Sequence, residues 1–217
     1  MTEPLPDGPM PGESAAAEAV SRGPLIGPDG KPRCPWGLSA PEYVAYHDQE
    51  WGRPVRGDRV IFERLSLEAF QSGLSWLTIL RKRENFRQAF ANFDIATVAA
   101  FTGEDESRLL ADAGIVRNKA KVRAVIANAR ASLELPVGLS DLVWSFAPAA
   151  GGPAPQTLSD LASVTPESKA LSARLKKHGF VFTGPVTAYA AMQACGIVND
   201  HLAGCFCRDL AGLSSEA

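Results

Sequence analysis

The chain has 217 residues, of which 46% are hydrophobic and 21% are charged, with a net charge of −2. This length suits one domain or two lobes that share a core, and the composition is ordinary for a globular protein. The sequence has no run of 18 apolar residues and no secretory signal, so we expect no membrane partner and a reducing cytoplasmic location, where its four cysteines stay unpaired.

The first 32 residues are rich in proline, glycine, alanine and acidic residues and show no apolar period. Residues 1–30 hold five acids and one base, a net charge of −4, which leaves +2 for the rest of the chain. Such a segment buries too little surface to offset the entropy of ordering it. We expect a disordered tail over residues 1–32, a helical domain in two lobes over 33–207 and a flexible tail over 208–217.

Aromatic side chains gather between residues 36 and 76, where they include Trp36, Tyr43, Tyr46, Trp51 and Trp76. Within this region the apolar spacing predicts a helix over residues 58–72. Glu68 falls among apolar residues of that helix, which suggests a specific task. The alternatives are a solvent-facing glutamate and tryptophans that only fill the core.

Residues 109–121 read as a helix, a tight turn at Gly114 and a second helix that begins near Arg117. The free N–H groups at the start of that second helix suit a phosphate, and nearby basic side chains would add electrostatic attraction to it. The candidate DNA contacts are therefore Gly114, Arg117, Lys119 and Lys121. The alternative to DNA contact, for these basic side chains and for the basic clusters at 81–87 and 174–177, is that they lie on solvated helix faces.

The C-terminal half shows clear helix boundaries. Thr165 followed by Pro166 predicts a helix start, and Gly179 predicts its end. Gly184-Pro185 and Gly196 bracket a second apolar helix. Phe180–Phe182 is the best candidate for a strand, although it is too short to build a sheet. We therefore expect an all-α fold with nine or ten helices.

Two cysteines and two histidines form a candidate metal site. Cys34 and His47 are 13 positions apart near the start of the domain, and His201 and Cys205 are four apart near its end. One helical turn would place the latter two on one face. Two sulfurs and two imidazoles suit a tetrahedral, structural zinc, and simple packing of small side chains is the alternative. Cys207 is a rival to Cys205, whereas Cys195 and His178 fit a core and a surface position.

Several segments, in order from Cys34 to Cys207, resemble the 3-methyladenine DNA glycosylase I family. They are Cys34-Pro35-Trp36, residues 43–52 (YVAYHDQEWG), residues 67–76 (LEAFQSGLSW), residues 83–86 (RENF), residues 143–146 (VWSF) and residues 192–201 (MQACGIVNDH). The acidic tail and the loop at 147–155 lie outside this pattern.

This resemblance implies a helix-hairpin-helix glycosylase fold with a zinc-bound lobe that joins the two ends of the core. It implies one structural zinc ion held by Cys34, His47, His201 and Cys205. It places Glu68 and Tyr46 as catalytic groups in a base pocket with Trp76, and it places the remaining aromatic residues, Trp36, Tyr43 and Trp51, in or beside that pocket.

The implied activity is hydrolysis of the N-glycosidic bond of 3-methyladenine in alkylated double-stranded DNA by a monomeric enzyme, with water as the nucleophile and the free base as product. Leu74 is a candidate wedge in the duplex, with a core leucine as the alternative. The competing hypothesis is a non-catalytic, zinc-stabilised protein that binds damaged DNA. A zinc deaminase or hydrolase is disfavoured, because the deaminase signature is absent and four protein ligands leave no open metal position.

Overall fold

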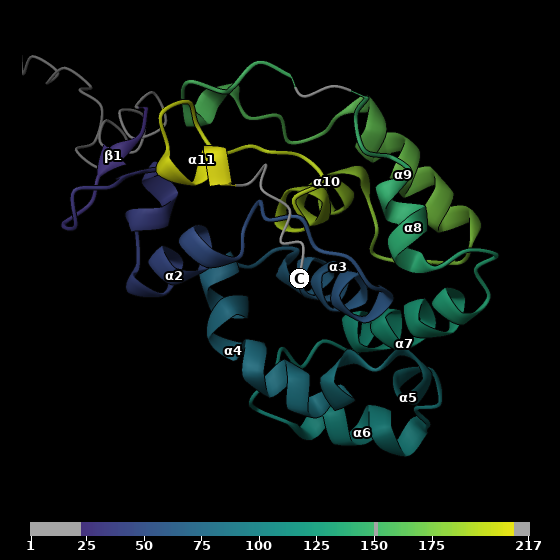
Figure 1. The fold of residues 1–217 in the computed structure, drawn as a ribbon. Helices are drawn as coiled ribbons and strands as arrows, with labels where there is room; N and C mark the ends of the chain where they lie inside the picture. Colours follow the sequence, from purple (N-terminus) through teal and green to yellow (C-terminus); the bar gives the residue numbers. More distant parts are fainter. Residues whose placement is uncertain (1–22, 150–151, 211–217) are drawn as a thin grey trace, which may run out of the picture.

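Helix α3 (Asp58–Gln71) lies at the centre of the fold (Figure 1). The computed structural model describes residues 23–149 and 152–210. In these residues α3 packs against four other helices, α4 (Trp76–Ala89), α7 (Lys119–Leu133), α8 (Leu139–Trp144) and α10 (Pro185–Ala194). Every side chain from Leu65 to Phe70 is buried, because α3 has neighbours on all sides.

The expected all-α class is confirmed. The described residues form ten α-helices, three short 3-10 helices and one pair of two-residue strands. The helices not yet given are α2 (Pro41–Gln49), α5 (Ile95–Ala99), α6 (Gly103–Ala111), α9 (Pro166–Lys177) and α11 (Phe206–Leu210). The 3-10 helices are η1 (Pro35–Leu38), η2 (Ala91–Phe93) and η3 (Leu158–Asp160).

The two ends of the described chain meet. Strand β1 (Leu25–Ile26) pairs antiparallel with β2 (Pro32–Arg33), and α11 packs against β2 (Figure 1). The expected disorder up to residue 32 therefore extends too far, while residues 1–22 lie outside the described residues. The composition gave no sign of this strand pair, because ion pairs stabilise it. Arg33 is buried and bonds to Asp29 at 2.6 Å and to Asp48 of α2 at 2.7 Å.

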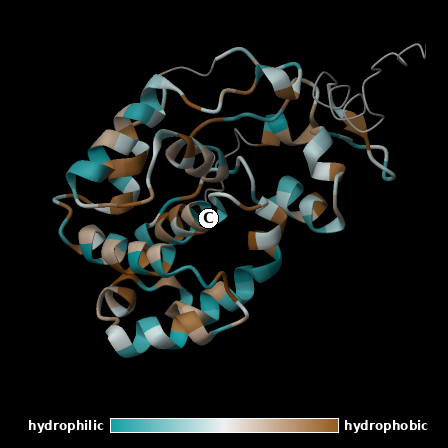
Figure 2. Ribbon diagram, turned by 180° about the vertical axis from the view of Figure 1, so that it is seen from behind, coloured by the Kyte–Doolittle hydropathy of each residue, from teal (hydrophilic) through white to brown (hydrophobic). Residues whose placement is uncertain are grey.

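The core beneath α3 is rich in phenylalanine. The Phe70 and Phe86 rings lie 4.5 Å apart, and Phe90 stacks on Phe93 at 5.7 Å. A second, smaller apolar cluster surrounds Cys34, Leu202, Cys205 and Cys207. Figure 2 shows hydrophilic and hydrophobic residues alternating around the outer helices, as expected when each of them buries one face.

Helix α9 begins and ends as the sequence predicts. Thr165 caps it, Pro166 opens it and Gly179 follows its end with a φ of 87°. The predicted strand at Phe180–Phe182 is wrong. Phe182 has a φ of 56°, and the Val181 backbone bonds to the side chain of Asn128, at 2.8 and 3.0 Å, instead of to a strand.

No helix among the described residues has the length and apolar character needed to cross a membrane.

Candidate functional site

The five predicted aromatic residues line one cavity of about 300 Å³. Its walls come from η1, α2, the loop after α2, α3, α4 and α10. The lining residues are Trp36, Tyr43, Tyr46, Trp51, Glu68, Gln71, Trp76, Leu161, Ala190 and Gln193. We call this cavity the aromatic pocket.

The rings of the aromatic pocket pack against one another edge to face or at a tilt. Trp36 meets Tyr43 and Trp51 edge to face, with ring centres 5.7 and 5.0 Å apart. Tyr46 lies 5.4 Å from Trp76 at a tilt of 44°. A pocket of this kind suits a flat ring system, because the negative faces of aromatic rings attract a cationic or electron-poor ring.

Glu68 is the buried carboxyl of the aromatic pocket. Burial raises its pKa to about 8, and the positive charge of Arg64, one helical turn earlier on α3, opposes that rise. Tyr46 is buried beside it, and its pKa is raised first by burial and then by the Glu68 charge. Glu68 is therefore a group that gains from a positively charged partner, since such a partner favours its ionised form.

A second cavity of about 290 Å³ lies on the other side of Glu68. It shares Tyr46, Glu68 and Trp76 with the aromatic pocket, so these three residues form the wall between the two cavities. The second cavity is lined mainly by charged residues, most of them in pairs, such as Arg83 with Glu50 at 2.8 Å. Glu68 thus lies between an aromatic and an ionic environment.

Trp76 carries a polar atom without a partner. Its indole Nε1 is buried and has no hydrogen-bond acceptor among residues 23–149 and 152–210. Trp76 lies where α4 begins, after Ser75, whose hydroxyl caps the helix. A buried N–H without an acceptor carries a free-energy cost, which an acceptor atom in the aromatic pocket would relieve.

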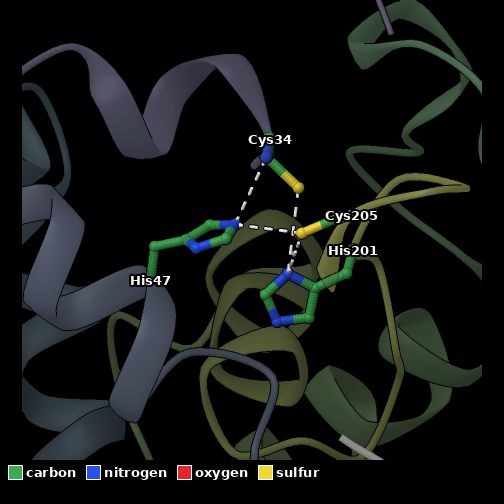
Figure 3. A group of neighbouring side chains, drawn as sticks. All are labelled: Cys34, His47, His201 and Cys205. Carbon is green, nitrogen blue, oxygen red and sulfur yellow. Dashed lines mark hydrogen bonds between the residues drawn. The ribbon is translucent and has the colours of Figure 1, made fainter. Parts of the chain in front are cut away.

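The four predicted metal ligands lie together and are buried (Figure 3). Their ligand atoms all lie within 4.8 Å of one another. Cys205 Sγ is 3.5 Å from His47 Nε2 and 3.6 Å from His201 Nδ1, and Cys34 Sγ is 3.8 Å from the same His201 nitrogen.

This donor set fits a tetrahedral ion. Bonds of about 2.3 Å to sulfur and about 2.0 Å to nitrogen would separate the two donor types by about 3.5 Å. Hydrogen bonds from the Cys207 and Cys34 thiols hold the pKa of Cys205 below its usual range, which favours a thiolate at this position. The buried group could therefore hold a metal ion.

The remaining nitrogen of each histidine is also bound. His47 Nδ1 pairs with Asp48 at 2.9 Å, and His201 Nε2 lies 3.1 Å from the carbonyl oxygen of Trp51. Such contacts orient metal-binding imidazoles. Gly52 has a φ of 73°, and a Cβ at this position would lie 2.9 Å from His201 Nε2, so only glycine leaves room for that ring.

The contact between His201 and Cys205 comes from a tight turn and not from the predicted helical turn. Cys205 N–H bonds to the Leu202 carbonyl at 2.9 Å, and α11 begins only at Phe206. Cys207, the rival ligand, lies outside the four, 3.8 Å from the other nitrogen of His47. Cys195 is buried in the core, and His178 ends α9, as expected.

The predicted hairpin is formed by α6, a turn at Gly114 and α7. Helix α7 begins at Lys119, two residues later than expected, and Asn118 caps it. Arg117 and Lys119 are exposed. Lys121 is not available to a phosphate, which corrects that prediction: it is buried, and its ammonium donates to the carbonyls of Phe70 and Ser72.

Leu74 lies in the loop between α3 and α4 and is 42% exposed, so it is not a core leucine. Its loop is joined to the hairpin, because Ser72 accepts the hydrogen bond from Lys121 at the start of α7. All four basic side chains of the cluster at 81–87 are engaged within the protein. Arg81, Arg83 and Arg87 pair with glutamates, and Lys82 bonds to the Ala113 and Gly114 carbonyls.

Sequence reasoning missed several residues of the site. Gln71 follows Glu68 by one turn of α3, a spacing that could have revealed it. Gln193 stands in the motif at 192–201, but nothing in the sequence shows that it lines the aromatic pocket. Leu161 comes from a segment without a regular pattern and gave no signal.

A family model described as methyladenine glycosylase matches residues 36–208. The chain is 48% identical over 183 residues to DNA-3-methyladenine glycosylase 1 of Escherichia coli (strain K12), with 81% of this chain and 96% of that protein covered.

Solved structures give the same result. A crystal structure of 3-methyladenine DNA glycosylase I is similar with a TM-score of 0.78 and 46% identity, and the match covers 81% of this chain and 99% of that one. The enzyme from Staphylococcus aureus, solved to explain 3-methyladenine recognition, is similar with a TM-score of 0.76 and 34% identity, over 80% of this chain and 94% of that one.

Proposed function

This chain belongs to the methyladenine glycosylase family, and we propose that its aromatic pocket receives a 3-methyladenine flipped out of duplex DNA. The protein is a base-excision glycosylase that hydrolyses the N-glycosidic bond of 3-methyladenine in alkylated DNA. The observation that carries the proposal for the site is the buried carboxyl of Glu68 within an aromatic pocket of about 300 Å³.

The chemistry of the damaged base matches this pocket. Methylation at N3 makes the adenine cationic and weakens its bond to deoxyribose, because the base leaves as a neutral molecule. The faces of Trp76 and Tyr46 attract the cationic ring, with about 0.5–2 kcal/mol per contact. Glu68 accepts a hydrogen bond from the exocyclic amine, and the positive charge of the base favours the ionised carboxylate.

Water is the nucleophile in this proposal. A lyase would need an amine with a depressed pKa beside the pocket, whereas neither the aromatic pocket nor the second cavity beside Glu68 is lined by a lysine. Burial does lower the pKa of Lys121, but its ammonium is held by the end of α3. Normal adenine is neutral and has a stronger glycosidic bond, so it gains less from the pocket.

Double-stranded DNA would lie across the hairpin and the loop that carries Leu74. The hairpin supplies exposed Arg117 and Lys119 and the first N–H groups of α7 for a phosphate. Leu74 is exposed on the adjoining loop and would enter the gap left by the flipped base. The hydrogen bond from Lys121 to Ser72 would hold the loop of Leu74 at a fixed position relative to the hairpin.

One zinc ion would be held by Cys34, His47, His201 and Cys205. With four protein ligands it would take no part in the reaction, and its role would be to tie the start of the domain to its end. The ring centre of Trp36 lies 5.1 Å from that of His47, and the ring centre of Trp51 lies 4.8 Å from that of His201. The metal site would therefore also stabilise one wall of the aromatic pocket. We further propose a monomer, and a location in the reducing cytoplasm, where the four free cysteines would stay reduced.

The test is release of 3-methyladenine from methylated duplex DNA, measured for the wild-type protein and for Glu68→Gln. We expect wild-type release and a strong loss in the variant, with both proteins folded. Folded, metal-loaded wild-type protein that binds the DNA but releases no base would favour the alternative of a non-catalytic damage-binding protein. Equal release by both proteins would remove Glu68 from the mechanism.

A further inference from the structure

Two side chains of α10, one of which lines the aromatic pocket, share one carboxylate. Tyr189 donates its hydroxyl to Asp200 Oδ2 at 2.6 Å, and Gln193 donates from Nε2 to the same oxygen at 2.7 Å. Tyr189 and Gln193 are four residues apart, so they lie on one face of α10. Asp200 comes from the segment just before His201 and faces both of them.

This arrangement fixes which way the Gln193 amide points. A carboxylate only accepts hydrogen bonds, so the NH₂ group of Gln193 must face Asp200. The carbonyl oxygen Oε1 is then the remaining polar atom of the side chain. The main chain of Gln193 is held as well, because its carbonyl accepts from Gly52 and Gly196 at 3.2 and 3.1 Å.

Gln193 lines the aromatic pocket together with Glu68 and Trp76. We propose that Gln193, with its amide oriented by Asp200, is a specificity-determining residue that selects a 3-methylated adenine over a 3-methylated guanine. The inference rests on the proposed function, because it assumes that the flipped purine occupies this pocket.

The selection follows from the atom at position 6 of the purine. Adenine carries an amine there, which donates to Oε1 of Gln193. Guanine carries a carbonyl oxygen there, which would face Oε1 with no proton between the two oxygens. Both atoms are acceptors, so when buried opposite each other neither of them has a hydrogen bond. Gln193 cannot turn its NH₂ toward the guanine oxygen without giving up the bond to Asp200.

Glu68 alone does not provide this selection. An ionised Glu68 accepts from an amine and rejects a carbonyl oxygen, but a protonated Glu68 could donate to that oxygen, so Glu68 discriminates only in its ionised state. The Gln193 amide has no second protonation state. Tyr189 is a positioning residue in this scheme, since it donates to the carboxylate that orients Gln193 and is not among the residues that line the aromatic pocket.

The experiment compares release of 3-methyladenine and 3-methylguanine from one preparation of methylated duplex DNA. For the wild-type protein we expect faster release of 3-methyladenine. Gln193→Leu should lower that rate by about tenfold and should leave release of 3-methylguanine unchanged or make it faster. The ratio of the 3-methyladenine rate to the 3-methylguanine rate should therefore fall by about tenfold or more. The matched control is Gln88→Leu, because Gln88 is an exposed residue of α4 and its change should leave both rates unchanged.

A second variant tests the role of Asp200. An amide at this position can accept or donate, so Asp200→Asn frees Gln193 to turn, and the ratio should narrow in the same direction. Metal content and thermal unfolding are measured alongside, because Asp200 precedes His201. A folded Gln193→Leu variant with the wild-type ratio would overturn the inference even if Asp200→Asn fails to fold. Wild-type protein that releases neither base would instead overturn the proposed function.

Discussion

Glu68 and Arg64 lie one turn apart on α3, where burial raises the pKa of the Glu68 carboxyl to about 8 and the Arg64 charge opposes the rise. A carboxyl with a raised pKa destabilises the folded protein when it ionises. The proposed function calls for a negative group beside a cationic base, so the fold would accept a local cost in stability at the proposed base site.

Glu68→Gln should therefore stabilise the protein while it reduces activity. Below about pH 4.5 the carboxyl is protonated in both the folded and unfolded states, so the change has little effect there. As the pH rises from 4.5 toward 8, the unfolded state loses its proton first, and the wild type loses stability. We expect the variant to be more stable by on the order of 3–5 kcal/mol above pH 8.

Urea unfolding of both proteins at acidic and alkaline pH measures this difference. Glu134→Gln is a suitable control, because Glu134 is exposed at the end of α7. A Glu68→Gln variant whose stability advantage does not grow with pH would show that the carboxyl is solvated in the folded protein.

The same pKa predicts the pH dependence of excision. In the proposed mechanism only the ionised form of Glu68 attracts the cationic base, so kcat/KM should rise with pH and level off above about 8. Bound DNA adds the positive charge of the base, so the rise in kcat should lie at lower pH. Rates measured from about pH 6 to about pH 9 test this, and Glu68→Gln should lack the dependence. A flat wild-type profile would contradict the assignment.

Removal of one metal ligand should reduce metal content and stability together. For Cys205→Ser we expect loss of the bound ion and a loss of several kcal/mol, because the free energy of metal binding adds to that of folding. Elemental analysis and thermal unfolding measure the two effects. Cys195→Ala is the control. Cys195 lies in the core, so this substitution should lower the free energy of unfolding by ~1–2 kcal/mol and leave the metal in place. Wild-type protein without metal would exclude the site.

Leu74→Ala should separate DNA handling from base binding. Leu74 is 42% exposed, so stability should change by less than about 0.5 kcal/mol. Excision from duplex DNA should fall by about tenfold, since the gap left by the flipped base is no longer filled. Binding of free 3-methyladenine should be unchanged. The control is Val137→Ala, another exposed apolar residue in a loop. Equal losses in both variants would argue against a wedge.

Much of the fold was predictable because local signals specify it. The capping threonine, proline and glycine around α9 gave its boundaries almost to the residue. The hairpin at residues 25–33 was not predictable, since it depends on Arg33 reaching Asp48 of α2. Phe180–Phe182 has the composition of a strand, but its backbone partner is the side chain of Asn128.

The site was predictable in its residues more than in its contacts. The aromatic residues, Glu68 and the four candidate metal ligands stood out by residue type and spacing, but their expected roles came from the family resemblance. Lys121 was assigned wrongly, since charge near a helix start does not show whether the side chain faces solvent or, as here, the end of α3. The role of Gln193 depends on Asp200, seven residues further on, and only the three-dimensional structure shows that contact.

The most direct test of the central claim follows the indole N–H resonance of Trp76 by NMR while free 3-methyladenine is added. This buried N–H has no acceptor among the described residues, and Trp76 forms a wall of the aromatic pocket beside Glu68. We predict a saturable shift of the Trp76 signal, assigned with Trp76→Phe, and a much smaller shift with adenine. Binding of 3-methyladenine that leaves the Trp76 signal unmoved would contradict the account.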